Sequence, residues 1–258
     1  MIKSLSIVYP MFNERENIST AVSEALRVGY TITPELEIVI VDDASTDGCG
    51  AIANQLALDH PEVKVRHHLV NRKLGGSLRT GFAAASNEWV LYMDSDLPIK
   101  MDDATNAVPL THEADLVIGW RKSRAESWKR DVMSSVYNWM IRRLFGLNVR
   151  DVNFAFKLFR RELLDGILLT SEGSFIDAEL LLEMKRIGAR IKEIGLDYYP
   201  RVAGVSTLAS NKVVFVILGE MVRYRMEAHG RANDSFGGER RRLWLEQRNQ
   251  SGDQVGVL

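Results

Sequence analysis

The stretch Trp89-Val-Leu-Tyr-Met-Asp-Ser-Asp-Leu-Pro98 (WVLYMDSDLP) joins a run of apolar residues to two carboxylates that lie one residue apart. Five mostly apolar residues in a row favour a strand covered on both faces, where polar side chains are costly. Asp94 and Asp96 then lie at the mouth of this strand. In an extended chain both side chains point to the same side and repel each other unless a positive charge lies between them. The stretch therefore predicts a buried strand with a divalent cation at its end.

Strand-like and helix-like patterns alternate on both sides of this stretch. Strands are predicted at 4–9, 36–41, 63–66 and 116–119, with helical spacing of apolar residues between them. Parallel strands need crossover connections, so the alternation predicts an α/β fold with a mostly parallel central sheet and helices on both faces. Ligands of such sheets bind at the carboxyl ends of the strands. One shared site is expected there, formed by the polar clusters at 10–14, 42–47, 94–98 and 120–124.

The second half of the chain has a less regular pattern. It predicts an amphipathic helix over 132–145, a strand over 154–159 and a helix over 178–187. The last part mixes Gly, Asn, Asp, Gln and Arg, which is typical of a loosely ordered segment. We therefore expect one domain over 1–230 and a polar tail over 231–258.

Composition excludes several classes of protein. A chain with 46% hydrophobic residues, 26% charged residues and a net charge of -1 is typical of a soluble globular protein, and its net charge does not favour nucleic-acid binding. Its one cysteine, Cys49, excludes an internal disulfide and a cysteine-rich zinc site. The apolar run at the start is too short for a secretory signal, and 213–218 is far shorter than the roughly 20 residues that cross a bilayer. We expect a cytoplasmic protein.

Four pieces of the sequence, taken in order, resemble the inverting family 2 glycosyltransferases of the GT-A (nucleotide-diphospho-sugar transferase) fold, and among them the dolichol-phosphate mannosyltransferase-like branch. Their order and spacing cover roughly the first 225 residues. The resemblance implies a GT-A domain over 1–230 that transfers a sugar from a UDP- or GDP-sugar with inversion. The pieces are VYPMFNE at 8–14, VIVDDASTDG at 39–48, GGSLRTG at 75–81 leading to MDSDL at 93–97, and FAFKLFRR at 154–161.

The resemblance places the base and ribose of the donor beside the first two polar clusters. A carboxylate can accept hydrogen bonds from ribose hydroxyls or a base N–H, and an aromatic edge supplies apolar contact. Two alternatives to donor binding stay open. Glu14 could be a solvated loop acid, and Asp42 or Asp43 could cap the next helix. The expected donor-binding residues here are Pro10, Phe12, Glu14, Val41 and Asp43.

The D-x-D motif implies a site for Mg²⁺ or Mn²⁺ against the donor diphosphate. Asp94 and Asp96 would be its ligands, Ser95 would lie beside the donor, and Asp96 also counts among the expected catalytic residues. Hard cations prefer carboxylate and phosphate oxygens, and Mg²⁺ often takes only one or two carboxylates plus the substrate. Relatives often carry a further polar residue two places after the second Asp. Here that residue is Pro98, whose side chain cannot be a ligand.

Glycine and basic residues are expected at the donor phosphates. Gly75 opens a helix, and helix N-termini favour anions. Lys73 and Arg79 are either phosphate or sugar contacts or plain surface charge. Arg121 and Arg201 match basic positions that the relatives use near the donor diphosphate or a lipid phosphate.

Three acids are candidates for a catalytic base. Inverting transfer to a hydroxyl needs such a base, whereas a phosphate nucleophile is already ionised. We expect Asp151 and Asp177 near the site as catalytic residues, with Glu179 close behind Asp177 in the sequence. Acids at the start of a helix also stabilise its dipole, so the pattern does not assign the base.

Polyprenyl or dolichyl phosphate is the acceptor that the resemblance favours, with a peripheral contact to the cytoplasmic face of a membrane. Relatives often have a lysine six residues after the arginine at 201; this chain has Thr207, although Lys212 could reach the site from the next helix. Residues 213–218 would shield the acceptor, lie on a membrane surface or pack on the domain or on a second subunit, so a homo-oligomer is left open.

Other functions remain in competition with this one. The acceptor could instead be soluble or a polysaccharide, although no Gln-x-x-Arg-Trp motif of processive synthases is present. A protein of another class would bind a nucleotide-sugar without turnover. A sugar nucleotidyltransferase is disfavoured, because residues 10–14 are not a glycine-rich basic loop.

Overall fold

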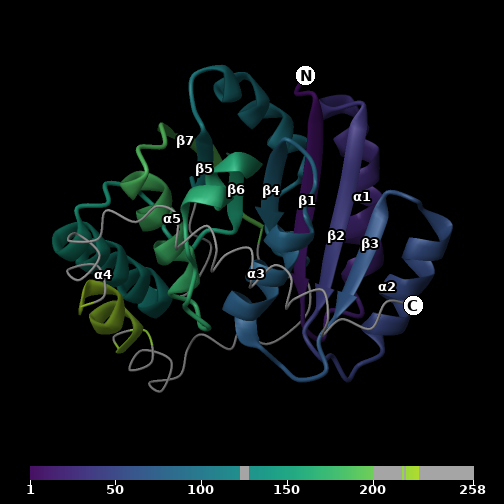
Figure 1. The fold of residues 1–258 in the computed structure, drawn as a ribbon, viewed down its shortest axis with the longest axis horizontal. Helices are drawn as coiled ribbons and strands as arrows, with labels where there is room; N and C mark the ends of the chain where they lie inside the picture. Colours follow the sequence, from purple (N-terminus) through teal and green to yellow (C-terminus); the bar gives the residue numbers. More distant parts are fainter. Residues whose placement is uncertain (123–127, 200–216, 218, 227–258) are drawn as a thin grey trace.

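A seven-stranded sheet forms the centre of the molecule. The computed structural model describes residues 1–122, 128–199, 217 and 219–226 (Figure 1). In this part of the chain the strand order is β3-β2-β1-β4-β6-β5-β7. The strands are β1 (Ser4–Met11), β2 (Glu35–Asp42), β3 (Val63–His67), β4 (Trp89–Met93), β5 (Leu116–Arg121), β6 (Phe156–Arg160) and β7 (Ile191–Leu196).

The strand directions confirm a mostly parallel α/β sheet. β1 pairs in parallel with β2 on one side and with β4 on the other, so that Ser6 lies opposite both Glu37 and Val90. The chain therefore winds outward from β1 in one direction and then crosses back to β4. This makes the gap between the carboxyl ends of β1 and β4 a topological switch point, where α/β sheets bind their ligands.

Helices cover both faces of the sheet. The apolar core splits into two clusters, one containing Ile7 of β1 with α1, α2 and η1, the other containing Val8 with α3, α4 and α5. Successive side chains of a strand point to opposite faces, which explains the split. The helices are α1 (Ile18–Ile32), α2 (Cys49–Asp59), α3 (Lys73–Ala84), η1 (Met101–His112), α4 (Trp128–Phe145), η2 (Arg161–Gly166) and α5 (Ile176–Arg186).

Two strands differ from what the sequence pattern predicts. β6 is antiparallel to both β4 and β5, which the local pattern does not reveal. β7 was not predicted, because the segment IKEIGL alternates poorly and lies half exposed at the edge of the sheet. The predicted helices at 132–145 and 178–187 are present as α4 and α5 and start a few residues earlier. The tail over 231–258 lies outside the described residues.

Gly75 in α3 is a point of close approach between two parts of the fold. Its backbone N–H donates to the Glu172 carbonyl at 2.8 Å. A Cβ atom at this position would lie 2.0 Å from the Ser171 carbonyl oxygen and 2.7 Å from the Glu172 Cα. The two contacting groups are backbone and cannot move aside as a flexible side chain can. Glycine is therefore required here by packing.

Replacing Gly75 by alanine should lower the free energy of unfolding by about 3 kcal/mol, because the added methyl group overpacks a backbone contact. The control is Gly219→Ala, since Gly219 is also helical and a Cβ there meets nothing within 4 Å. That variant should be unchanged or more stable by up to about 1 kcal/mol. Urea unfolding of both variants measures the difference, and equal stabilities would contradict the close approach.

Candidate functional site

The carboxyl ends of β1, β2 and β4 meet at the switch point. Ser95, directly after Asp94, donates from Oγ to the Pro10 carbonyl at 3.3 Å. The Asp43 backbone N–H donates to the Met11 carbonyl at 2.9 Å. Polar residues that are far apart in the sequence therefore line one edge of the sheet, as the parallel topology predicts. The clusters at 10–14, 42–47 and 94–98 therefore lie together at this edge.

The loops after β1 and β2 hold each other in place. The Asn13 backbone N–H donates to Ser45 Oγ at 3.0 Å, and the Asn13 side chain accepts from the Thr46 N–H at 2.8 Å. Asn13 and Ala44 both have left-handed backbone conformations, with φ of 58° and 60°. Phe12, in the first of these braced loops, is 47% exposed. An exposed aromatic ring on a fixed loop is suited to contact a flat apolar ligand surface.

Asp42 and Asp43 fix turns and do not cap the next helix. Asp42 accepts from the Ser45 N–H at 3.1 Å and contacts His67 Nδ1 at 2.9 Å. Asp43 uses Oδ1 to contact His68 Nδ1 at 2.6 Å and to accept from a backbone N–H in the following loop at 2.7 Å. The N-cap residue of α2 is Gly48, and the preceding Asp47 accepts from the N–H of Cys49, the first residue of that helix, at 2.9 Å.

Glu14 is anchored at the start of α1. Its carboxylate accepts from the Asn17 side-chain amide at 2.6 Å, and its carbonyl accepts from the backbone N–H groups of Asn17 and Ile18 at 3.0 Å each. The side chain is half-buried. The Glu14 side chain is therefore held in place beside the loop after β1, and its contact with the donor stays a prediction.

Asp94 and Asp96 lie at the end of β4, next to the β1 loop. Asp94 is half-buried and Asp96 is 7% exposed, and the chain turns directly after them at Leu97, whose φ is 53°. Within the described ranges no three His, Cys, Asp or Glu side chains gather into a metal cage. Two carboxylates at an open edge fit a hard cation that takes its other ligands from water and substrate. The Tyr199 backbone N–H donates to the Pro98 carbonyl at 2.9 Å. This bond joins the loop after β4 to the segment after β7.

Arg121 and Asp151 are brought together, and they pair with each other. The guanidinium donates from Nε to Asp151 Oδ2 at 2.7 Å and from Nη2 to Oδ1 at 3.0 Å. The same guanidinium lies over the rings of Phe154 and Tyr198, at 5.7 and 5.4 Å from their centroids. The two rings contact each other edge to face with centroids 6.3 Å apart, and a bidentate pair packed against them has a fixed orientation. Asp151 therefore positions Arg121.

Asp177 is bound in a buried ion pair that the sequence analysis did not predict. Lys157 of β6 donates to Asp177 Oδ1 at 2.5 Å and to the Phe154 carbonyl at 3.0 Å, and both side chains are less than 5% exposed. Burial raises the pKa of Asp177, the Lys157 charge opposes that rise, and the Asp151 charge adds to it. The only signal in the sequence was a lysine inside the apolar run FAFKLF.

Tyr92 lies between this ion pair and the two carboxylates of the D-x-D motif. Its ring lies 5.1 Å from Lys157 Nζ, and in the strand it precedes Asp94 by two residues and so shares its face. Burial raises the pKa of Tyr92 well above its usual range, with the charges of Asp177, Asp94 and Asp96 adding to the effect. The charges of all three carboxylates therefore disfavour ionisation of the Tyr92 phenol. Lys157 contacts both the Tyr92 ring and Asp177.

Three other predicted residues form hydrogen bonds with nearby loops of the protein. The Glu179 carboxylate accepts from the Thr170 N–H, the Thr170 hydroxyl and the Ser171 N–H at 2.8 to 3.1 Å. Arg79 donates to the Ser171 carbonyl at 2.5 Å. The Gly75 N–H is used by Glu172, and the N–H that opens α3 donates to the Asn71 side chain at 3.1 Å. The prediction that the Gly75 amide binds a donor phosphate at the N-terminus of α3 is therefore not supported, because this amide donates its hydrogen bond to the Glu172 carbonyl.

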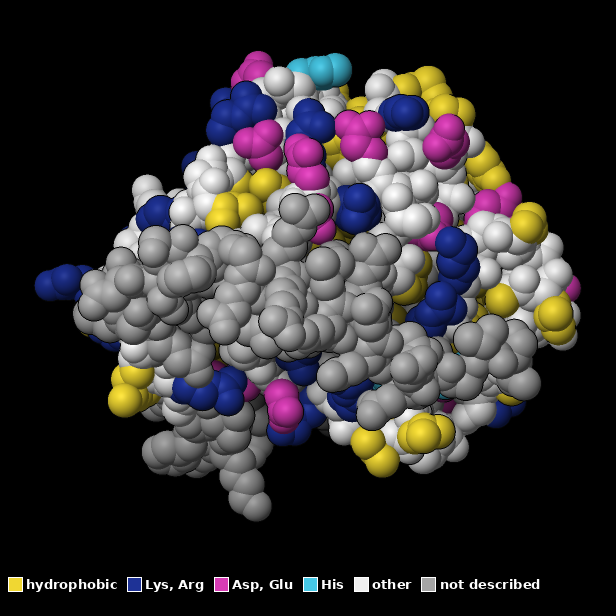
Figure 2. Space-filling view, in the orientation of Figure 1, with side chains coloured by type: hydrophobic (Ala, Val, Ile, Leu, Met, Phe, Trp, Pro, Cys, Tyr) yellow, Lys and Arg dark blue, Asp and Glu magenta, His cyan; other side chains and the backbone are white. Residues whose placement is uncertain are grey.

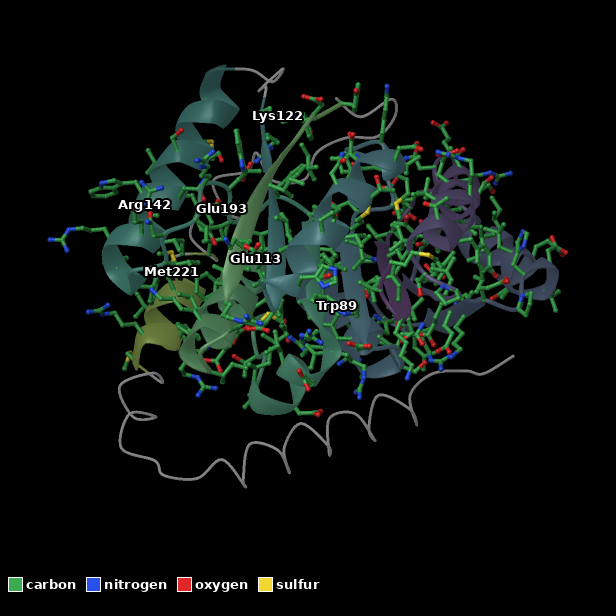
Figure 3. All side chains as sticks on the ribbon, turned by 90° about the horizontal axis from the view of Figure 1, so that it is seen from above. Trp89, Glu113, Lys122, Arg142, Glu193 and Met221 are labelled. Carbon is green, nitrogen blue, oxygen red and sulfur yellow. The ribbon has the colours of Figure 1, made fainter. Side chains whose placement is uncertain are left out.

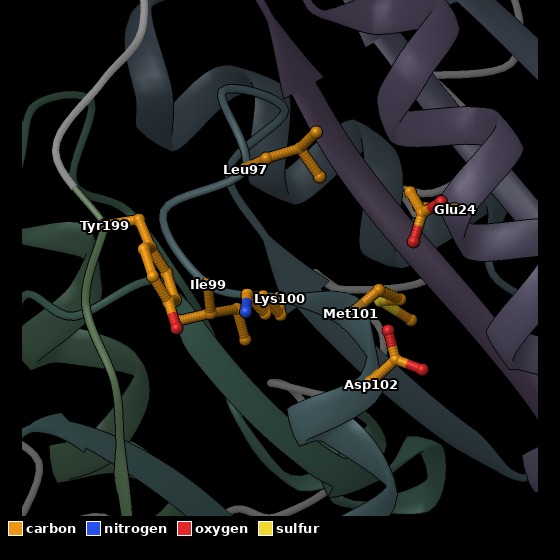
Figure 4. Close-up of a pocket in the computed structure, with 7 residues that line it drawn as sticks. All are labelled: Glu24, Leu97, Ile99, Lys100, Met101, Asp102 and Tyr199. Atoms are coloured by element: carbon orange, nitrogen blue, oxygen red, sulfur yellow. The ribbon is translucent and has the colours of Figure 1, made fainter.

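A pocket of about 340 Å³ lies beside this site (Figure 4). It includes Leu97, which follows Asp96, but none of the predicted site residues, so it is distinct from the switch-point site. Its two acids are held by Arg27, which pairs with both at 2.5 Å. The lining residues are Glu24, Leu97, Ile99, Lys100, Met101, Asp102 and Tyr199.

Several predicted acceptor-side residues lie outside the described residues: Arg201, Thr207, Lys212 and most of 213–218.

Comparison with known proteins gives consistent matches. Residues 6–168 match the family model described as glycosyl transferase family 2. Polyprenol monophosphomannose synthase of Mycolicibacterium smegmatis is 29% identical over 225 residues, which cover 80% of this chain and 82% of that protein. Undecaprenyl-phosphate mannosyltransferase of Micrococcus luteus is 28% identical over 231 residues, covering 83% and 89%. Other curated relatives are longer, and the chain spans 33% to 54% of their length.

The fold is also found among solved structures. Glucosyl-3-phosphoglycerate synthase from Mycobacterium tuberculosis, in complex with Mn²⁺ and UDP-glucose, superposes with a TM-score of 0.66 at 18% identity. The match covers 84% of this chain and 78% of that chain. This likeness confirms the predicted GT-A fold.

Replacing Lys157 by methionine should lower the free energy of unfolding by about 3–5 kcal/mol near neutral pH, because Asp177 is left buried without its cation. The loss should be smaller at about pH 5 than at about pH 8. Without Lys157 the folded-state pKa of Asp177 lies further above its unfolded value, so the folded variant binds a proton more tightly and loses stability as pH rises through that folded pKa.

Urea unfolding at both pH values measures this dependence. The control is Lys192→Met, which removes an exposed ion pair with Glu113 and should change stability little at either pH. The double variant Lys157→Met/Asp177→Leu should recover most of the loss, since it removes both charges. A loss in Lys157→Met that is equal at the two pH values would contradict the role assigned to the pair.

Proposed function

Because the chain belongs to glycosyl transferase family 2, we propose that it transfers a sugar from a UDP- or GDP-sugar to a polyprenyl phosphate, with inversion at the anomeric carbon. The observation that carries the proposal is the meeting of Asp94 and Asp96 with the β1 loop at the switch point, within the matched family segment. The names of the two relatives from Mycolicibacterium smegmatis and Micrococcus luteus refer to polyprenyl-type phosphates.

The donor base and ribose would lie on the rim formed by the β1 and β2 loops. Phe12 would supply an exposed aromatic ring, and Pro10, which pairs with the buried Val41 across β1 and β2, would contribute apolar surface. The contacts that Asp43 makes in the described part of the chain use Oδ1, which leaves Oδ2 to accept from a ribose hydroxyl. Glu14 is the second acid at this rim.

Asp94 and Asp96 would hold Mg²⁺ or Mn²⁺ together with the donor diphosphate, and the Mn²⁺ and UDP-glucose in the solved complex of similar fold support this assignment. When bound, the ion offsets the charge that develops on the leaving nucleoside diphosphate. Ser95 keeps the two carboxylates against the β1 loop through its bond to Pro10. Arg121, oriented by Asp151, would add positive charge near the diphosphate.

The three candidate base residues already have partners within the protein, which supports a phosphate acceptor over a hydroxyl acceptor. Asp151 pairs with Arg121, Asp177 pairs with Lys157, and the Glu179 carboxylate binds a loop backbone. A hydroxyl nucleophile needs a general base in reach, whereas a phosphate oxygen is ionised at neutral pH. An acceptor that brings its own anionic nucleophile therefore fits this site best, and Asp151 and Asp177 act as positioning residues.

Isothermal titration with UDP and GDP, with and without Mn²⁺, tests the donor site. One nucleotide should bind in a metal-dependent way. The variant Asp94→Asn/Asp96→Asn should weaken this binding by at least about tenfold, since even outer-shell partners of a metal contribute that much. The matched control Asp102→Asn/Asp103→Asn changes two acids at the start of η1 and should bind as the parent does. A folded parent that binds neither nucleotide would refute the proposal.

A transfer assay with matched acceptors tests the nucleophile. With a radiolabelled donor sugar, polyprenyl phosphate should be glycosylated and the corresponding polyprenol should not, because only the phosphate is ionised without a base. Product formed on polyprenol, or only on a soluble sugar, would reject the phosphate acceptor while leaving the donor assignment intact.

A further inference from the structure

Two consecutive histidines contact two consecutive aspartates. His67 is the last residue of β3 and lies opposite Asp42, the last residue of β2, in the strand register. His67 Nδ1 lies 2.9 Å from Asp42 Oδ2, and His68 Nδ1 lies 2.6 Å from Asp43 Oδ1. The second pair therefore lies just beyond the ends of both strands, at the carboxyl edge of the sheet that carries the candidate site.

The two pairs are directed to opposite faces of the sheet, because neighbouring residues of an extended chain alternate. His67 Nε2 lies 2.7 Å from the Asn54 side chain of α2, and His68 Nε2 lies 2.9 Å from the Thr80 hydroxyl of α3. The side chains of His68 and Asp43 are 2% and 4% exposed, whereas that of His67 is 25% exposed. Figure 2 shows histidine (cyan) at the upper edge of the molecule. His68 is instead buried against α3.

The partners of His68 define which of its ring nitrogens carries a proton. An ionised carboxylate only accepts hydrogen bonds, so Nδ1 of His68 donates to Asp43. In the neutral ring Nε2 is then the acceptor, and the Thr80 hydroxyl donates to it. Thr80 therefore fixes the ring of His68, and His68 in turn fixes one oxygen of Asp43.

Asp43 is held by both of the neighbouring loops. Its backbone N–H donates to the Met11 carbonyl at 2.9 Å, and its carbonyl accepts from the Asn71 side chain at 3.2 Å. Oδ1 contacts His68 at 2.6 Å and accepts from the Arg72 N–H at 2.7 Å. In the described part of the chain, Oδ2 takes part in none of these contacts. The orientation of the carboxylate is therefore set by His68 and by the Arg72 amide.

We propose that His68 is a positioning residue for the donor, which holds Asp43 so that Oδ2 is presented to a hydrogen-bond donor of the nucleoside. The inference rests on the proposed donor site, and it assigns a role to a residue that lies behind that site. A ligand that meets a carboxylate already held in place loses less conformational freedom on binding than one that has to order it. The imidazole between Asp43 and Thr80 supplies this order before the nucleotide arrives.

His68 lies toward the end of the molecule that the first half of the chain forms. β3 is the strand at one edge of the described sheet and packs against α2. Figure 3 shows α1 and α2 at the end opposite Arg142 of α4 and Met221. α4, like the other described helices, is not long and apolar enough to cross a bilayer. A change at His68 should therefore alter the affinity for the donor nucleotide and leave the affinity for the acceptor unchanged.

Nucleotide titration of the full chain with matched histidine variants tests the proposal. The probe is whichever of UDP and GDP the parent binds in the presence of Mn²⁺. His68→Leu should weaken binding about tenfold, as expected when a hydrogen bond to a charged group is lost. His68→Asn should restore most of the affinity, because its side-chain amide nitrogen can take the place of Nδ1 and donate to Asp43. The control His67→Leu removes the neighbouring contact to Asp42 and should bind as the parent does.

A double-variant cycle separates positioning from a general loss of structure. In Asp43→Asn the amide oxygen can still accept from His68 and Arg72, but an N–H group replaces Oδ2 and cannot accept from the ligand. This variant should bind more weakly than the parent. Adding His68→Leu to it should weaken binding no further, because both changes remove the same interaction. In the transfer assay His68→Leu should raise the KM for the donor and leave kcat unchanged, since the nucleoside is bound equally before and during transfer.

Circular dichroism checks that each variant is folded, and Thr80→Val takes the place of His68→Leu in the cycle if that variant is not. Thr80→Val keeps the branched side chain and removes only the hydroxyl partner of His68, so it should also weaken binding.

Three results would overturn the inference while leaving the donor site intact: equal affinities of His68→Leu and the parent, equal losses in His68→Leu and His67→Leu, or losses that add in the double variant. A parent that binds neither nucleotide would overturn the proposed donor site, and the inference with it.

Discussion

The negative charge at the switch point has to be compensated by the surrounding structure. Asp94, Asp96, Asp151 and Asp177 lie on or behind one edge of the sheet, and the last two are almost fully buried. A buried carboxylate without a partner costs several kcal/mol. The fold meets this cost with Arg121, which is bound bidentately by Asp151, and with Lys157, which reaches Asp177 from the middle of β6.

This compensation depends on the one antiparallel strand of the described sheet. β6 runs against β4, so that Lys157 lies opposite Tyr92 and its ammonium group is near the phenol ring. The same strand separates β4 from β5, which ends at Arg121. A single strand thus sets the distance between the carboxylates of the D-x-D motif at the end of β4 and Arg121 at the end of β5.

The two halves of the chain contribute different parts of the switch-point site. The first half forms a rim of mutually braced loops around the switch point, with Phe12 47% exposed. The second half contributes Asp151 and Asp177, each paired with a cation. Asn138 of α4 accepts the Val152 N–H and so connects α4 to the loop that carries Asp151.

The sequence by itself determined the strand and helix order of the first half, the D-x-D motif at the end of β4 and the membership of a glycosyltransferase family. These features depend on neighbouring residues, since periodicity and strand ends are local patterns. The tertiary structure alone decided that Gly75 is a packing contact, that Asp151 binds Arg121 and that Asp177 binds Lys157. Those contacts join residues 20 or more positions apart, and their partners are set by strand direction and register, which a local pattern does not encode.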